Sequence, residues 1–245
     1  MLHAINGRKA RLGVFRSAGI RVPLEDVVTS TVFGPIEFMS PEDARRSIDL
    51  ICEALALPLP TSVGPLRAVF WPRLPLADDA LRVRYSEPDL VFADDVGLVM
   101  VVEIKWGAPL SENELAAQWS ALSHVDRGRA THVLLVQEPG SYRQAVEMDR
   151  DLVDARGMGP WNLVIRNWRS LAVMGVLART PNTSEAVQRW ASAVALFLMR
   201  EHRSAVRGWS EIRLIRMNEM DWCFRRPWFS EVDTVVRHEG WWVND

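Results

Sequence analysis

The chain has 245 residues, 48% of them hydrophobic and 24% charged, with a formal net charge of −2. This balance is typical of a globular protein and excludes a disordered or fibrous chain, and it gives no sign of a strongly basic nucleic-acid-binding surface. No apolar run approaches the ~18 residues that a membrane-spanning helix needs, and the first residues lack the apolar segment of a secretion signal. We therefore expect a cytoplasmic protein with no membrane contact.

Helix signals come first in the chain and strand signals follow. Residues 25–38 carry apolar side chains at helical spacing, which predicts a helix interrupted at Gly34-Pro35. Ser40 can cap a second helix that begins at Pro41 and ends before the prolines at positions 58 and 60. Strand-like runs follow at residues 66–71, 89–93 and 98–106.

The last two of these runs flank a tight turn at residues 94–97, where Gly97 can supply a positive φ. Ser111 to Glu114 has the pattern of a capping box and predicts a helix that continues to about Val125. Further strands are expected at residues 131–137 and 161–165, followed by a long amphipathic helix over residues 185–200.

This order predicts the α/β class, with a central mixed sheet flanked by helices. We expect one domain over residues 1–245. Its core lies at residues 22–140, and residues 141–245 complete the sheet and add a helical, Trp-rich C-terminal region. The tryptophans of that region predict contacts with the core, with another copy of the chain or with a partner protein, or else stacking on nucleic-acid bases.

Cysteine and histidine spacing argues against a zinc site. Cys52 and Cys223 are isolated, and the five histidines include no pair at helical HxxxH spacing. His124 and His202 are expected to be solvated. Any metal ion should therefore have oxygen ligands.

The strand at residues 98–106 is apolar on both sides until Glu103 and Lys105, which point the same way from it. Buried charges of this kind are paired or bind a metal ion. If the preceding hairpin turns around Val96, Asp89 falls opposite Glu103. Two adjacent carboxylates repel each other unless a cation holds them, and Mg²⁺ is a hard cation with oxygen ligands that suits such a pair.

The segment Pro88-Asp89, thirteen further residues and Glu103-Ile104-Lys105 resembles the signature of the PD-(D/E)XK nuclease superfamily. The resemblance implies a restriction-endonuclease-like αβββαβ core and an Mg²⁺ or Mn²⁺ ion. Its ligands would be Asp89, Glu103 and the Ile104 carbonyl, and Lys105 would be the catalytic lysine.

Members of this superfamily often add an acidic residue from the first core helix and a glutamine from the helix after the lysine. Glu25 is the first candidate for that acidic residue, ahead of Asp26 and Glu37, and Gln118 fits the glutamine. The tyrosine that often follows the glutamine by four residues is replaced by Leu122, which departs from the RecB-like branch.

The resemblance implies a metal-dependent nuclease that hydrolyses nucleic acid, DNA before RNA, in defence against phage or in repair. The alternatives are a catalytically inactive binding or assembly subunit of the same fold and a toxin-like ribonuclease. Each site residue also has a structural interpretation. Glu103 and Lys105 can form a simple ion pair with Asp89 ending a loop, Gln118 can bond a backbone group in the core, and Glu25 can serve only its helix dipole.

Overall fold

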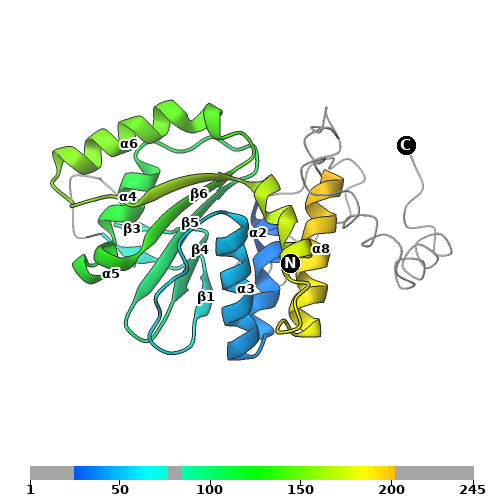
Figure 1. Ribbon diagram of the computed structural model, residues 1–245. Helices are drawn as coiled ribbons and strands as arrows, with labels where there is room; N and C mark the ends of the chain where they lie inside the picture. The colour runs from blue at the N-terminus through cyan, green and yellow to red at the C-terminus, as the bar shows by residue number, and fades with distance from the viewer. Residues whose placement is uncertain (1–24, 77–83, 202–245) are drawn as a thin grey trace. The chain divides into compact units, whose positions relative to one another are not determined.

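A five-stranded mixed sheet, in the order β1-β4-β5-β6-β7, lies at the centre of the folded chain (Figure 1). The first three strands pair antiparallel, and β5, β6 and β7 pair parallel. The strands are β1 Arg67–Phe70, β4 Leu90–Ala93, β5 Leu98–Lys105, β6 Thr131–Val136 and β7 Leu163–Asn167. The predicted α/β class with a mixed sheet is confirmed.

The computed structural model describes residues 25–76 and 84–201. The sequence also predicts a short strand or a loosely docked tail over residues 1–20. That expectation, and those for His202, Cys223 and the Trp-rich region beyond residue 201, concern residues outside this range. Two helices precede the sheet, α2 Glu25–Phe33 and α3 Pro41–Ala54, with a 3-10 turn, η2 Gly34–Phe38, between them. The later helices are α4 Glu114–Ser120, α5 His124–Arg129, α6 Arg143–Ala155, α7 Met174–Leu177 and α8 Glu185–Glu201.

Three short elements complete the described part. They are the two-stranded ladder of β2 Leu74–Pro75 with β3 Tyr85–Ser86, and the 3-10 turns η4 Pro139–Tyr142 and η5 Trp168–Val173. Over the described ranges, no helix combines the length and the apolar character that crossing a bilayer requires.

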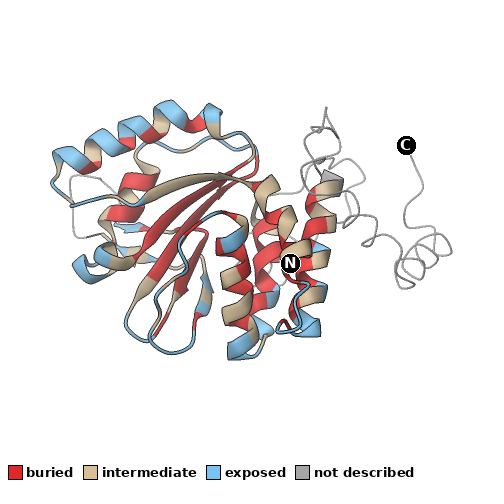
Figure 2. Ribbon diagram, in the orientation of Figure 1, coloured by how far each residue is buried: buried red, intermediate tan, exposed pale blue. Residues whose placement is uncertain are grey.

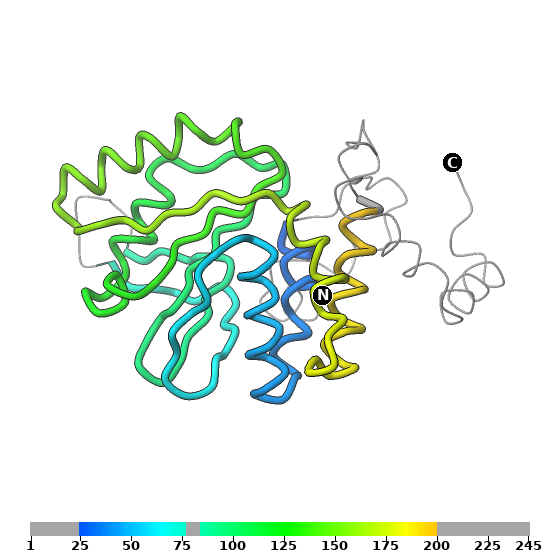
Figure 3. The backbone as a smooth tube through the Cα atoms, in the orientation of Figure 1, coloured from blue at the N-terminus to red at the C-terminus, as the bar shows by residue number. Residues whose placement is uncertain are grey.

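Helices cover both faces of the sheet, so its central strands β4, β5 and β6 are buried, while the outer surface of α6 is exposed (Figure 2). One face packs against α2, α3, α7 and α8 in the largest apolar cluster, to which β5 contributes Met100, Val102 and Ile104. The backbone trace shows α3 and α8 together on that side of the sheet (Figure 3). The other face packs against α4 and α6 through Val91, Val101 and Trp119. A sheet covered on both faces explains the near-continuous apolar run of β5.

The N-terminal helix predictions are confirmed. The Ser40 hydroxyl accepts a hydrogen bond from the Asp43 N–H at 3.1 Å, which caps α3, and Pro41 is its first residue. The preceding helix ends at Phe33, where Gly34-Pro35 opens the 3-10 turn. Pro35 lacks the N–H that a continued α-helix would use, which explains this ending.

The single helix predicted from the capping box to about Val125 is wrong. The chain forms α4, leaves the helical path at residues 121–123 and starts again at α5, which the Ser123 hydroxyl caps through the Asp126 N–H at 3.0 Å. Ser123 competes for the backbone as a capping residue, which favours a new helix start over continuation. His124 is exposed at the start of α5, as expected for a solvated histidine.

Helix α6 was not predicted from the sequence. It connects β6 to β7, and two parallel neighbours require a crossover that is usually helical. Its buried positions are Val146, Asp149 and Val153, so an acidic residue interrupts the apolar stripe that would have signalled the helix.

The β4–β5 hairpin agrees with the predicted register, because Leu90 pairs with Val102 and Phe92 with Met100. An irregularity then brings Ala93 opposite Leu98. Regular strand alternation would put Leu98 and Met100 on the same face of the sheet. Because of the bulge, Leu98 lies instead on the face that α4 covers, opposite to Met100.

The prediction that Gly97 supplies a positive φ is wrong, because the φ angle of Gly97 is not positive. A Cβ atom there would lie 2.3 Å from Oδ1 of Asp126, an oxygen that accepts the Leu98 N–H at 2.7 Å. The glycine therefore leaves room for the Asp126 carboxylate and does not supply a positive φ.

Candidate active site

Asp89, Glu103 and Lys105 lie together at one end of the central sheet. Asp89 directly precedes β4, and extending the Leu90–Val102 pairing by one residue places it opposite Glu103. Glu103 and Lys105 are two residues apart on β5, so their side chains leave the same face of the strand. The three residues are only 8%, 2% and 7% exposed, respectively. The structure thus gathers two carboxyl groups and an ammonium into one buried cluster.

Asp89 is fixed by contacts to strand β5 and to Trp71, the residue that follows β1. Its Oδ2 accepts the Ile104 N–H at 2.8 Å, and its Oδ1 accepts the indole N–H of Trp71 at 3.3 Å. The Trp71 backbone N–H also donates to the Asp89 carbonyl at 3.1 Å, and Trp71 has φ of 48°, which a bulky residue rarely adopts. These bonds show that Asp89 does more than end a loop.

Both carboxylate oxygens of Glu103 have hydrogen-bond donors. Oε1 accepts from the Lys105 ammonium at 2.5 Å, and Oε2 accepts from the amide Nε2 of Gln118 at 2.5 Å. Gln118 is 1% exposed and reaches Glu103 from α4. The alternative in which Gln118 bonds a backbone group is therefore wrong.

Lys105 faces two further carboxylates besides Glu103. Its Nζ lies 3.0 Å from Oε1 of Glu114 at the start of α4 and 3.9 Å from Oε1 of Glu25 at the start of α2. The other oxygen of Glu25 accepts the Trp106 N–H at 2.7 Å. Glu25 therefore contacts the end of β5, and the alternative in which it serves only its helix dipole is wrong.

The two lesser candidates for the additional acidic residue differ in position. Asp26 lies close enough for its charge to contribute to the raised pKa values of Glu25 and Asp89. Glu37 is exposed in η2, beside an apolar cavity of about 730 Å³ that extends to Trp71.

Burial controls the protonation of the cluster. Burial raises the pKa of Asp89 to about 7, although the Ile104 N–H acts in the opposite direction. Burial also raises the pKa of Glu103 well above its usual range, with the charge of Asp89 adding to the effect. Burial alone would lower the pKa of Lys105, but Glu103, Glu114 and Glu25 outweigh it and raise that pKa. The lysine therefore stays charged while the carboxyl groups resist ionisation.

Among the described residues, no group of three or more His, Cys, Asp or Glu side chains is arranged so that it could bind a metal ion. The contacts of Glu103 give a physical reason, because Lys105 and Gln118 already engage its two oxygens. The cluster nevertheless offers oxygen donors from two buried acidic groups, Asp89 and Glu103, which is the donor chemistry of a hard divalent cation.

Pro88 affects the third expected ligand, the carbonyl of Ile104. The register of the hairpin, continued past Asp89, brings Pro88 opposite Ile104. The Ile104 N–H points toward β4, since it donates to Asp89, and in a strand the carbonyl of the same residue points to the same edge. Proline has no N–H to donate to that carbonyl.

Three contacts of the cluster were not found from the sequence. Glu114 was assigned to a capping box, and its Oε2 does accept the Ser111 N–H at 2.7 Å, but its other oxygen faces Lys105. Trp71 precedes the cluster by many residues and carries no motif. His132 lies in the apolar strand β6, and its Nε2 is 2.9 Å from Oε1 of Gln118. A polar residue in a buried strand was the available signal for His132.

A comparison of the chain with models of known protein families, with curated proteins and with solved structures found no match in any of the three.

Proposed function

We propose that this protein is a divalent-metal-dependent nuclease that hydrolyses phosphodiester bonds of nucleic acid, with DNA as the first substrate to test. The observation that supports it most is the excess of acidic groups around one ammonium. Glu25, Glu103 and Glu114 surround Lys105, and Asp89 lies opposite Glu103. A bound cation would reduce the repulsion between the carboxylates of such a buried cluster. The pKa values of Asp89 and Glu103 are raised because their ionised forms are unfavourable without a cation.

The order of the elements adds support. Apart from the separate β2–β3 ladder and the short helix α5, the chain runs through α3, β1, β4, β5, α4 and β6, which is the αβββαβ order of a restriction-endonuclease-like core. The sequence signature lies on the β4–β5 hairpin of this core, and Gln118 lies on the helix after it. The motif and the order of the elements are therefore both consistent with the same superfamily.

Asp89 and Glu103 would hold the cation, together with the carbonyl of Ile104, opposite which the continued hairpin register brings Pro88. Lys105 would then have to release Oε1 of Glu103. Glu114, at 3.0 Å, and Glu25, at 3.9 Å, are the groups that would keep the ammonium in place. The cluster therefore contains replacement partners for the lysine.

When bound, the ion supplies electrostatic stabilisation of the phosphate and a more acidic water. Lys105 contributes a compact positive charge beside the developing negative charge of the transition state. Gln118 holds Oε2 of Glu103, and Trp71 with the Ile104 N–H holds Asp89, so both acidic groups are oriented before a substrate arrives.

The test is cleavage of plasmid and linear DNA, with total RNA as a parallel substrate, in Mg²⁺ or Mn²⁺ and in EDTA. We expect cleavage that requires the ion and falls about 10²- to 10³-fold in Glu103→Ala and in Lys105→Ala. Glu147→Ala, which removes an exposed carboxylate of α6, is the matched control and should cleave like the parent protein. Undiminished cleavage in both site variants would refute the proposal, and cleavage of RNA alone would favour the ribonuclease.

A second candidate is a binding or assembly subunit with the same fold and no catalysis. The bonding of Glu103 favours it, because both carboxylate oxygens already have donors in the chain itself. This candidate predicts no heat of Mg²⁺ binding in calorimetry, no cleavage of either nucleic acid, and a stable complex in which the Lys105→Ala protein still takes part.

A further inference from the structure

A continuous series of hydrogen bonds, part-buried at Trp161 and fully buried beyond it, leads from the edge of the sheet to Glu103. The indole Nε1 of Trp161 lies 3.0 Å from Nδ1 of His132, and Nε2 of His132 lies 2.9 Å from Oε1 of Gln118. The amide nitrogen of Gln118 then donates to Oε2 of Glu103 at 2.5 Å. Four side chains from four different segments are thereby connected.

The chemistry of the first member fixes the direction of every later bond. An indole N–H can only donate, so Nδ1 of His132 must accept and the imidazole proton must be on Nε2. That N–H can only donate to Gln118, so the amide oxygen faces His132 and the NH₂ faces Glu103. The orientation of the Gln118 amide is therefore determined by Trp161, two bonds away.

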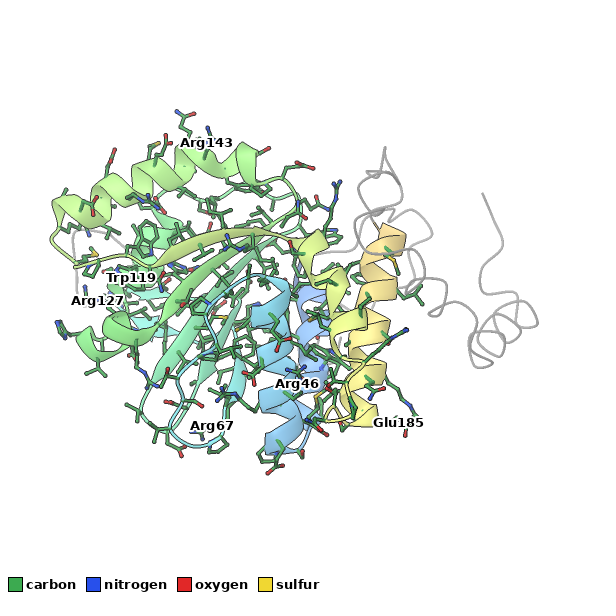
Figure 4. All side chains as sticks on the ribbon, viewed as in Figure 1. Arg46, Arg67, Trp119, Arg127, Arg143 and Glu185 are labelled. Atoms are coloured by element: carbon green, nitrogen blue, oxygen red, sulfur yellow. The ribbon has the colours of Figure 1, made fainter. Side chains whose placement is uncertain are left out.

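Packing holds His132 in place for this role. The β5–β6 register pairs Val101 with His132 and Glu103 with Leu134, so the imidazole leaves the same face as the carboxylate, one strand away. The imidazole is fully buried and stacks on Trp119, with ring centroids 6.1 Å apart and planes within 9° (Trp119 is labelled in Figure 4). Burial lowers the pKa of His132 to about 3, so the ring stays neutral.

We propose that His132 and Trp161 are positioning residues, which hold the Gln118 amide so that Oε2 of Glu103 is always engaged and Oε1 is the oxygen offered to a cation. With the other tautomer of His132, Gln118 would turn its oxygen toward the carboxylate, and two acceptors would face each other. The expected effect on cation binding rests on the proposed function, whereas the hydrogen-bond series itself can be tested without assuming that function.

The first measurement is NMR of the full chain, with the ring nitrogens of His132 and the side-chain amide of Gln118 observed. We expect the Nε2–H tautomer of His132 and slow exchange of the Gln118 NH₂ protons. Trp161→Phe removes the donor to Nδ1 while keeping an aromatic ring, and we expect it to allow both tautomers and to speed exchange of the Gln118 amide. Trp168→Phe is the matched control, because within the described chain its buried indole N–H has no hydrogen-bond partner.

The second measurement is the affinity for Mg²⁺ by calorimetry. Loss of a residue that orients a metal ligand costs about 10- to 100-fold in affinity, so His132→Leu should weaken binding about 10-fold. His132→Gln places an amide that can donate to Gln118 and should restore affinity to within about 3-fold of the parent. A residue that merely filled space would favour leucine over glutamine at this buried position.

The two proposals fail in different ways. If the parent protein neither binds Mg²⁺ nor cleaves nucleic acid, the proposed function is wrong, and the NMR result alone decides on the hydrogen-bond series. If the Trp161→Phe spectrum shows an unchanged tautomer and unchanged Gln118 exchange, the series itself is wrong. If those signals change while His132→Leu binds Mg²⁺ like the parent, the positioning role is overturned.

Discussion

Lys105 is the residue on which the charge balance of the cluster depends. It is one of only two lysines among the 29 basic residues of the chain, and it is 7% exposed beside three carboxylates. Replacing Lys105 by arginine would change the site, because a planar guanidinium presents its N–H groups differently from a compact ammonium. The lysine offsets, in the metal-free protein, part of the repulsion that a cation would otherwise have to relieve.

We therefore expect Lys105→Met to destabilise the metal-free protein by about 3 kcal/mol at about pH 8, since removal of one partner leaves buried charge without compensation. At about pH 5.5 the loss should be smaller, because Asp89 and Glu103, whose pKa values are raised, take up protons and become neutral. Urea unfolding in EDTA measures both values.

Arg143→Met, which removes an exposed positive charge from α6, is the control and should change stability by less than about 0.5 kcal/mol at either pH. An equal effect of Lys105→Met at the two pH values would show that its carboxylate neighbours do not control its contribution.

Residue-scale prediction from sequence succeeded where the geometry was local. The two-residue period of a strand put Glu103 and Lys105 on one face, and the symmetry of a hairpin put Asp89 opposite Glu103. Glu114 and His132 could not be found in this way. Their contacts depend on how α4 and β6 dock against β5, which no local spacing specifies.

At the scale of elements, the start of α4 decides where Gln118 and Glu114 lie. Asn113, the residue before the helix, has φ of 59° and makes no capping bond with its side chain. The cap comes instead from α6, where Oδ2 of Asp149 accepts the N–H groups of Leu115 at 2.8 Å and Ala116 at 3.1 Å. The sequence showed a capping pattern at the correct place, but the residue that caps is more than thirty positions away.

Asp149→Ala should destabilise the protein by about 1–2 kcal/mol, because two buried N–H groups lose their acceptor. The Leu115 and Ala116 amides should exchange faster with solvent, and Mg²⁺ affinity should fall, since α4 carries Gln118. Amide exchange and calorimetry measure these effects. Asp151→Ala removes an exposed carboxylate of the same helix and should leave all three quantities unchanged. Parent-like exchange at Leu115 and Ala116 in the Asp149 variant would contradict this account of α4.

At the scale of the whole described chain, the sheet needs helices on both faces. Apolar runs, turns and caps predicted most of them, and the long apolar face of α8 was sufficient to place it. Helix α6 was missed because its surface is largely exposed and its buried side includes Asp149. The requirement of parallel β6 and β7 for a crossover is a property of the sheet as a whole, so it could not be read from the segment alone.

The whole-molecule consequence of the buried carboxyl groups is a stability that falls with rising pH. Asp89 has a folded pKa of about 7 against an unfolded value of about 4, so between these values the folded state binds more protons and loses stability as pH rises. Glu103, whose pKa burial and the charge of Asp89 also raise, adds to this loss. His132, with its pKa lowered to about 3 by burial, acts in the opposite direction, but only up to its unfolded value of about 6.5.

Above about pH 6.5 the carboxyl groups therefore dominate, and we expect the unfolding free energy in EDTA to decrease as the pH rises through about 7. Excess Mg²⁺ should remove or reverse this slope, because a cation binds the ionised carboxylates of the folded state and makes their deprotonation favourable. Urea titrations at several pH values, with EDTA and with Mg²⁺, measure both slopes. A stability that rises with pH in EDTA would mean that Asp89 and Glu103 ionise at their ordinary values. Stability curves that run parallel with and without Mg²⁺ would mean instead that the carboxyl pKa values are raised but that the carboxylates bind no cation. The experiment therefore tests the electrostatics of the cluster separately from its proposed role in metal binding.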